Sequence, residues 1–168
     1  KNKISLINLH NILRAVIFPG SVPAKRRFNL SNNDYRFLYQ CMSSWPGESE
    51  YPSYDTATYH DAYAKFLMYG SEKGTLPGNI RIFNKIGDAY GFLTDIAYIA
   101  DFEKRIEFML SCTILCNTDG IFNDDNYDYE TIGFPFMKNL GQVIYNYEKQ
   151  RTRKLRPDLS RFLIDYNR

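Results

Sequence analysis

The sequence is poor in the residues that build disulfide frameworks and metal centres. Its 168 residues include three cysteines and two histidines. An odd and sparse set of cysteines makes no disulfide framework. Cys112 and Cys116, four apart on one predicted strand, would lie about 13 Å from each other, too far to be bridged. His10 and His60 have no cysteine or histidine at ligand spacing, so we expect no metal site and no cofactor.

Acidic residues are missing from the start of the chain, and charges of one sign gather elsewhere. No Asp or Glu precedes Asp34, the segment 117–130 holds five acidic residues and no basic one, and the segment 149–156 is basic. The net charge of +2 is too small to imply a nucleic-acid partner. We interpret these segments as solvated surface that pairs with opposite charge. The acidic segment does not match an EF-hand loop, whose glycine stands at the sixth position, and a bound cation there is left open.

Long apolar runs are also absent, so we expect no membrane span. The hydrophobic content of 44% and the aromatic content of 16% indicate a folded chain, because disordered chains are poor in aromatic residues. A chain of this length fits one domain. With no signal peptide and no initiator methionine visible, we expect residues 1–168 to be a single domain or the C-terminal portion of a larger one.

Apolar residues at helical spacing predict four helices, at 5–17, 31–42, 55–70 and 134–151. Ser5 and Ser31 suit the N-cap positions of the first two, and Asp34 completes an approximate capping box with Ser31. Gly70 is expected to end the third helix. The segment 43–58 reads as a loop.

Three strands are predicted between the third and fourth helices, at 80–86, 90–100 and 105–116. The connections at 87–89 and 102–104 are short enough for antiparallel hairpins. The sequence therefore predicts an α+β fold with a three-stranded antiparallel sheet packed with helices. Its parts are a helical region (1–78), the sheet (79–116), an acidic loop (117–133), a C-terminal helix (134–151) and a tail (152–168).

The sequence Lys85-Ile86-Gly87 stands at the predicted end of the first strand, and Asp95-Ile96-Ala97 follows on the second. With the order of elements over residues 3–150, this resembles the C-terminal part of the serine β-lactamase and DD-peptidase superfamily, class A in particular. In that family a helical region precedes three antiparallel strands. The first strand carries a Lys-Thr/Ser-Gly motif, and a C-terminal helix crosses the sheet.

The resemblance implies roles for five neighbouring residues. Lys85 would bind a substrate carboxylate and assist proton movement, and the backbone N–H of Asp88 would donate to an oxyanion. Gly87 would let the substrate approach the strand closely, beside Ile86 and Ala89 as further substrate-binding positions. The substrate would be a cell-wall peptide or a β-lactam-like small molecule. The location would be periplasmic or otherwise extracytoplasmic.

Two family features have no counterpart in the chain. Ile86 occupies the position of the family's hydroxyl residue, and the nucleophile motif Ser-x-x-Lys does not occur. Ser31-Asn32-Asn33 reads as a helix cap and not as the family's Ser-Asp-Asn loop. We therefore expect the chain to lack the N-terminal strands and the nucleophile region, so that the chain alone does not settle whether the protein is an enzyme.

Three functions stay open on the sequence alone. The first is the C-terminal portion of a β-lactamase-like serine hydrolase that performs acyl transfer. The second is a catalytically inactive binding or interaction module on the same scaffold, and the third is an unrelated α+β adaptor. Lys85 by itself would also suit a protective lysine on an edge strand. We expect the apolar edge of strand 105–116 to be covered by the missing N-terminal region, a second chain, a self-pairing dimer or the tail.

Overall fold

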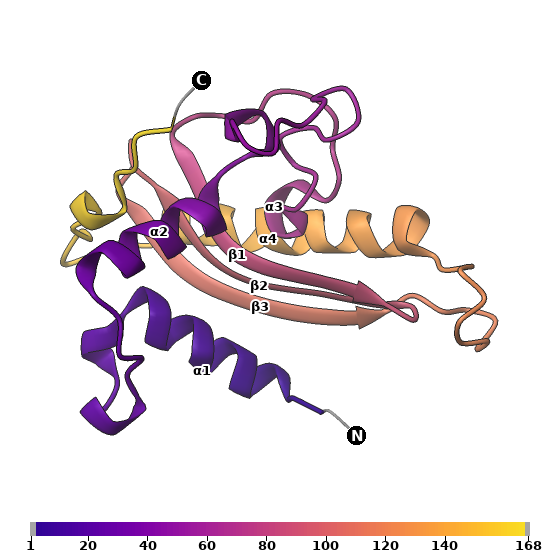
Figure 1. Ribbon diagram of the computed structural model, residues 1–168, viewed down its shortest axis with the longest axis horizontal. Helices are drawn as coiled ribbons and strands as arrows, with labels where there is room; N and C mark the ends of the chain where they lie inside the picture. The colour runs from indigo at the N-terminus through magenta and orange to yellow at the C-terminus, as the bar shows by residue number, and fades with distance from the viewer. Residues whose placement is uncertain (1–2, 167–168) are drawn as a thin grey trace.

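A three-stranded antiparallel sheet forms the middle layer of the protein, with helices on both of its faces (Figure 1). The computed structural model describes residues 3–166. Its main elements are, in chain order, α1 (Leu6–Ile17), α2 (Asn32–Ser43), α3 (Phe66–Tyr69), β1 (Ile80–Ala89), β2 (Phe92–Asp101), β3 (Ile106–Leu115) and α4 (Phe134–Gln150). The α+β fold with its antiparallel sheet is thereby confirmed. No helix within residues 3–166 is long and apolar enough to cross a membrane.

The first two helices begin where their capping residues predicted. The Ser5 hydroxyl accepts a hydrogen bond from the N–H of Asn8 at 3.2 Å. Ser31 and Asp34 form a reciprocal capping box, in which each side chain bonds the other residue's backbone N–H. The Ser31 hydroxyl and the Ser31 N–H both donate to the Asp34 carboxylate, and these two hydrogen bonds lower the pKa of Asp34. Local side-chain chemistry is therefore sufficient to fix these helix starts.

The predicted helix at 55–70 is wrong. Turns occupy most of that range, and α3 is a single distorted turn in which Met68 has a φ of +80°. The N–H of Leu67 donates to the buried Asp95 carboxylate at 3.0 Å instead of to a helical carbonyl. Gly70 does end the element, with a φ of +61°. A long-range polar contact has overridden the local helical pattern here.

The strand order β1-β2-β3 and both antiparallel pairings agree with the prediction. The first turn lies later than predicted, because β1 continues to Ala89 and the chain reverses at Tyr90 and Gly91. Both turn residues have positive φ, +53° and +81°, as a two-residue type I′ hairpin requires. Lys85-Ile86-Gly87 consequently lies within the strand and not at its end, which corrects the expected turn at 87–89.

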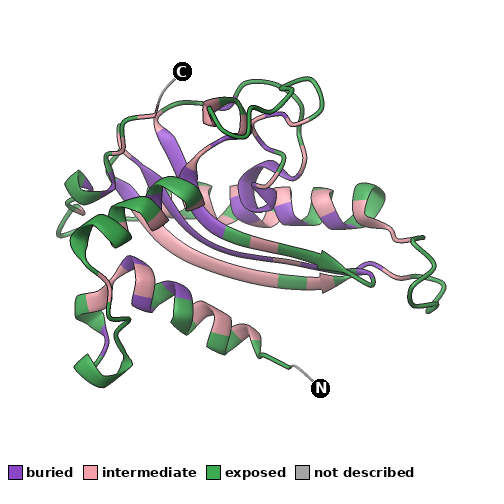
Figure 2. Cartoon of the chain, viewed as in Figure 1, coloured by how far each residue is buried: buried purple, intermediate pink, exposed green. Residues whose placement is uncertain are grey.

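Each face of the sheet buries its own apolar core. The α4 face packs Ile82, Ala97 and Ile99 against α3 and Met137, and the opposite face packs Phe83 and Tyr98 against the helices α1 and α2 and the tail. β2 is buried almost throughout, whereas β1 is buried only in its first half, and Figure 2 shows it turning exposed toward the hairpin. The exposed half of β1 is the part that carries the motif.

β3 is an edge strand, as expected, and its residues are mostly half-buried. Within residues 3–166 no fourth strand pairs with it. The tail reaches its beginning, where Arg105 donates to the carbonyl of Pro157 at 3.1 Å, but the tail forms a 3-10 turn and no strand. A partner that covers the rest of this edge stays a prediction.

Candidate functional site

The structure brings the five predicted site residues together at the exposed end of β1. Lys85, Ile86, Gly87, Asp88 and Ala89 line one surface hollow of about 440 Å³. Its remaining wall comes from α1 and β2, through Leu9, Phe92, Thr94 and Ile96. Because side chains alternate along a strand, the first, third and fifth of these β1 residues face α1, and the other two face the α4 side.

The backbone of this segment is turned toward open space. Ala89 and Phe92 flank the two-residue turn and form a hydrogen-bonded pair, so the next pair, Asp88 with Leu93, is a non-hydrogen-bonded one. The N–H and C=O groups of Asp88 and Ile86 therefore point away from β2. In agreement, the Lys85 ammonium donates to the carbonyl of Ile86 at 2.5 Å. The segment thus offers backbone donors and acceptors at a free sheet edge.

Gly87 leaves room beside these groups. A Cβ built on Gly87 would meet no atom within 4 Å. The residue has no positive φ, so its backbone does not demand glycine. The glycine therefore leaves the strand accessible at this position without being required by a local turn, which makes Gly87 suitable for substitution experiments.

A buried polar cluster, consisting of Lys65, Asn84 and Asp95, lies beneath the motif. Lys65 donates to the Asn84 side-chain oxygen at 2.8 Å, and Asn84 donates to the Asp95 carboxylate at 2.9 Å. Asn84 directly precedes Lys85, and Asp95 is the cross-strand partner of Ile86. The cluster therefore holds the strand at the point where its exposed half begins.

Burial dominates the electrostatics of this cluster. Desolvation lowers the pKa of Lys65 to about 8 and raises the pKa of Asp95 to about 6. Sequence reasoning missed Lys65 and Asn84, because a lysine in a predicted helix and an asparagine in a strand look like surface residues. An available signal was Asp95, a lone acid within the otherwise apolar strand 90–100.

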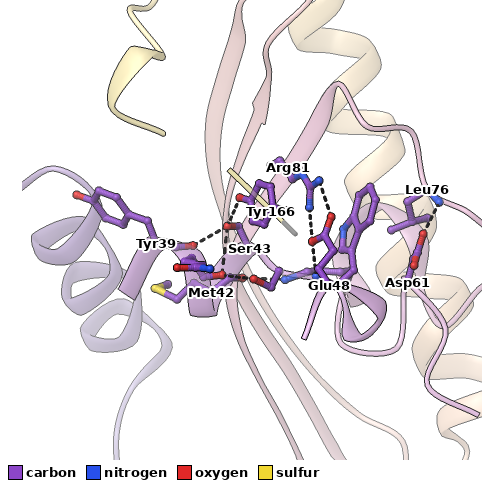
Figure 3. A network of polar contacts seen from close by, with 12 residues as sticks. Tyr39, Met42, Ser43, Glu48, Asp61, Leu76, Arg81 and Tyr166 are labelled. Carbon is purple, nitrogen blue, oxygen red and sulfur yellow. Dashed lines mark hydrogen bonds and ion pairs between the residues drawn. The ribbon is translucent and has the colours of Figure 1, made fainter. Parts of the chain in front are cut away.

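Arg81 fixes the beginning of β1 in a similar manner (Figure 3). Its guanidinium makes two hydrogen bonds of 2.8 Å to the Glu48 carboxylate, and it lies between the rings of Trp45 and Tyr166, with its central carbon 3.9 Å and 3.8 Å from their centroids. The Tyr166 hydroxyl in turn bonds Ser43 at 2.5 Å. This arginine connects β1, the loop after α2 and the tail, and neither Arg81 nor Glu48 was predicted to matter.

Among the described residues, no nucleophile lines the hollow with a base beside it. Thr94 bonds the Thr113 hydroxyl at 2.8 Å. A serine–histidine pair does exist on the same face, where Ser111 and His10 Nδ1 lie 2.8 Å apart. Ser111 is on β3, two strands from Lys85 and therefore about 10 Å away. Within residues 3–166 no three His, Cys, Asp or Glu side chains converge to hold a metal ion.

Comparisons with known proteins do not extend this description. No protein family, curated protein or solved structure matches the chain. Function is therefore inferred from the residues of the chain itself.

Proposed function

We propose that this chain is the C-terminal portion of a β-lactamase-like serine hydrolase and supplies one wall of its active site. The observation that carries the proposal is the free edge of β1, where an outward-facing Asp88 N–H, an unobstructed Gly87 and the Lys85 ammonium meet in one hollow. The substrate class is a cell-wall peptide or a β-lactam-like molecule, and the location is extracytoplasmic.

The geometry supports an acyl-transfer step. A serine oxygen from a segment outside this chain gives up its proton to a base in that segment and bonds to the carbonyl carbon, while the carbonyl π electron pair moves onto the carbonyl oxygen. The Asp88 N–H donates to that oxyanion, which is the interaction that most lowers the barrier of such a step. Lys85 places a positive charge beside it and beside a substrate carboxylate. Collapse of the intermediate re-forms the carbonyl and breaks the bond to the leaving group, which departs as an amine or alcohol with the proton that was removed from the serine.

A catalytically inactive binding module is the second candidate, and Ile86 favours it. The isoleucine packs its side chain against the core cluster under α4 and offers no hydroxyl to a substrate. Its outward-facing backbone groups would still bind an extended peptide at the β1 edge. The two candidates differ in whether a covalent acyl group is ever formed.

The test uses the natural full-length protein and a fluorescent penicillin. The coding sequence upstream of Lys1 should contain Ser-x-x-Lys, and the protein should become covalently labelled. Gly87→Val should slow labelling at least tenfold by placing a branched side chain in the hollow, and Lys85→Met about 100-fold. Gly78→Val and Lys73→Met are the matched controls, because both residues are exposed and lie outside the hollow, and a Cβ at Gly78 meets no atom within 4 Å.

Each outcome separates the candidates. An upstream sequence without Ser-x-x-Lys refutes the hydrolase. No labelling, together with saturable binding of an extended peptide that Gly87→Val abolishes, supports the binding module instead. Equal labelling of the Gly87 and Gly78 variants would show that the β1 edge takes no part in the reaction.

A further inference from the structure

The free edge of β3 lies on the side of the sheet opposite to β1 and its motif. Because Phe92 and Ala89 form a hydrogen-bonded pair, the backbone groups of the next residue, Leu93, point toward its β3 partner Ile114. The backbone groups of the alternate β3 residues therefore point away from the sheet; these residues are Met109, Ser111 and Thr113. No backbone hydrogen bond described within residues 3–166 satisfies these outward groups.

β3 also lacks the residues that usually protect an exposed edge. Between residues 108 and 118 the chain contains no Lys, Arg, Asp, Glu or Pro. The exposed half of β1, by contrast, carries Lys85 and Asp88. Proteins protect a free edge with charges or prolines, or they cover it with another segment. The composition of β3 therefore indicates an edge that is covered.

Helix α4 continues this surface with an apolar stripe. Gly141 and Lys138 mark the flank of α4 that contacts Met68 in α3 and the following Glu72. Residues three and four apart share a flank of a helix, and four apolar residues with this spacing lie on the flank away from α3: Phe136, Leu140, Val143 and Tyr147. Since α4 contacts β3 while α3 contacts β2, this stripe lies on the side of the β3 edge. Leu140 is half-buried, and the other three residues are exposed.

On the opposite face of the sheet, α1 adds an exposed isoleucine beside the same edge. His10 Nδ1 lies 2.8 Å from the Ser111 hydroxyl, so this flank of α1 stands over β3. Ile7 precedes His10 by three residues on the same flank and is exposed. Apolar side chains therefore lie on both sides of the open strand.

The exposed area is large enough for a stable dimer. The exposed side chains of the stripe and Ile7 offer about 400–500 Å² per copy. Strand pairing would also cover the half-buried β3 residues Phe108 and Leu110, which brings the area to roughly 700–800 Å². This is close to the roughly 800 Å² that each partner contributes to an interface of standard size.

The stripe on α4 is complementary to a second copy of itself. Its residues follow one another at steps of four, three and four, and this order is unchanged when the helix is reversed. In an antiparallel pair, Phe136 lies opposite Tyr147 of the second copy, and Leu140 lies opposite Val143. An isologous contact about a two-fold axis requires this kind of self-complementarity. An upstream strand added to β3 would use the edge but would not account for the symmetric stripe beside it.

We propose that the β3 edge and the α4 stripe form the interface of a two-fold symmetric dimer of this chain. The β3 strands of the two copies pair antiparallel, so the two sheets become one continuous sheet, and the α4 helices pack antiparallel on it. The motif at Lys85 lies at the other edge of the sheet and stays open in the dimer. The dimer does not rest on the function proposed above.

Sedimentation of residues 1–168 at about 1–100 μM tests the dimer, since each face of the sheet has its own core within this chain. The chain should sediment with twice the mass of one copy. Its dissociation constant should be about 10 μM or lower, because interfaces of this size range from micromolar to picomolar affinity. A monomer at about 100 μM would overturn the proposal.

Charge variants at Val143 test the two-fold axis. Val143 stands next to the centre of the stripe, so it faces its own copy across the axis. Val143→Glu and Val143→Lys should each weaken the dimer at least about 10-fold, and an equal mixture of the two should dimerise at least about 5-fold more tightly than either alone. A mixture that dimerises no better than the separate variants would contradict the two-fold packing.

The matched control is Phe37→Glu. Phe37 is 66% exposed and Val143 is 64% exposed, but Phe37 lies on α2, which contacts β1 at the other edge of the sheet. The control should keep the dissociation constant within about 2-fold of the wild type. Equal weakening by Phe37→Glu and Val143→Glu would show nonspecific association and refute the interface.

Hydrogen exchange tests the strand pairing directly. In the dimer the outward N–H groups of β3, at Met109, Ser111 and Thr113, are bonded across the interface. At about 100 μM they should exchange at least about 10-fold more slowly in the wild type than in Val143→Glu. Equal exchange in the two proteins would show that β3 is not paired, and would refute the proposal.

The natural full-length protein decides between a second copy and an upstream segment. It should be a dimer that Val143→Glu dissociates. A monomeric full-length protein would overturn the proposal, even if residues 1–168 dimerise, and would assign the edge to the segment upstream of Lys1. Labelling by the fluorescent penicillin reports separately on the hydrolase: a labelled monomer refutes the dimer alone, and an unlabelled dimer refutes the hydrolase alone.

Discussion

The donors and acceptors of the buried cluster Lys65–Asn84–Asp95 can be arranged in one way only. The Asn84 oxygen accepts from the Lys65 ammonium at 2.8 Å, and its NH₂ group donates to one Asp95 oxygen at 2.9 Å and to the carbonyl of Ala64 at 2.8 Å. The second Asp95 oxygen accepts from the N–H of Leu67 at 3.0 Å. A flipped Asn84 amide would set NH₂ against ammonium, so the direction of every bond is fixed.

Each single substitution should therefore be costly. Asp95→Asn replaces an accepting oxygen by an NH₂ group that must face another donor, at about 1–3 kcal/mol, and it removes the buried negative charge near Lys65. Together these effects should lower the free energy of unfolding by about 3–5 kcal/mol. Lys65→Met removes a donor to Asn84 and to the carbonyl of Met42. This substitution should lower the free energy of unfolding by about 2–4 kcal/mol, which is somewhat less than for Asp95→Asn. The loss is smaller because Asp95 can take up a proton, so that no unpaired buried charge remains.

The double variant should lose much less stability than the sum of the losses in the two single variants. In the double variant both buried charges are gone, so neither the cation that Asp95→Asn leaves without its carboxylate nor the acid that Lys65→Met leaves without its ammonium remains. The oxygen of the introduced amide still accepts from the N–H of Leu67, so one unfavourable contact between its NH₂ group and that of Asn84 is the cost that stays. We expect a favourable coupling of at least about 2 kcal/mol between the two sites.

Urea unfolding at pH 7.5, followed by the emission of Trp45, measures all four proteins of the cycle. The control cycle uses Lys138→Met and Glu72→Gln, since the side chains of this ion pair are 31% and 48% exposed to solvent and should show a coupling below about 1 kcal/mol. A coupling between Lys65 and Asp95 within about 0.5 kcal/mol of zero would show that the two buried charges do not stabilise each other.

Two further predictions follow from the same packing. Since burial raises the pKa of Asp95 from 3.8 to about 6, the folded state holds a proton that the unfolded state has lost between these values. The stability of the wild type relative to Asp95→Asn should therefore fall by about 2 kcal/mol as the pH rises from 4 to 6, and a flat difference in urea midpoints would contradict the assignment. Gly141→Ala should lower the thermal midpoint and reduce the free energy of unfolding by about 3 kcal/mol or more, because the added Cβ would lie 2.2 Å from the backbone nitrogen of Met68. The control is Gly20→Ala, which should be nearly neutral because a Cβ there meets no atom within 4 Å.

The fold could be predicted where local chemistry decides it. Ser5 and Ser31 cap their helices with their own hydroxyls, and the three strands alternate or are apolar throughout. The predictions are wrong where contacts between residues far apart in the sequence set the local conformation. The helix pattern at 55–70 yields to the bond between Leu67 and Asp95, a contact 28 residues apart along the chain. Likewise, Gly87 and Asp88 are typical turn residues, but the strand continues through them because Tyr90 and Gly91 adopt the positive φ of the hairpin.

The sequence alone places the candidate residues next to one another, but it does not show which contacts hold them in place. Lys85 to Ala89 stand out in the sequence because they form one contiguous motif, and the structure keeps them in one hollow. Arg81 and Lys65 do not stand out, because their importance depends on partners, Glu48 and Asn84, that lie 33 and 19 residues away. A side chain whose role is set by a distant partner leaves no local signal in one sequence.

The contacts of Arg81 and Asn84 explain how one edge of β1 can be exposed while the strand stays ordered. The unpaired backbone groups of an exposed edge strand can pair with strands of other chains, and most proteins protect such edges with charged residues, prolines or covering segments. In β1 the first half is fastened by Arg81 and Asn84, and the second half, from Lys85 onward, is left bare. Lys85 directs its charge to the carbonyl of Ile86, which lies on the open edge, so an apolar strand that pairs there must displace an ammonium. A ligand that brings its own carboxylate or oxyanion instead gains a partner. The arrangement therefore favours anionic or polar groups at this edge over indiscriminate strand pairing, as either function proposed for it would require.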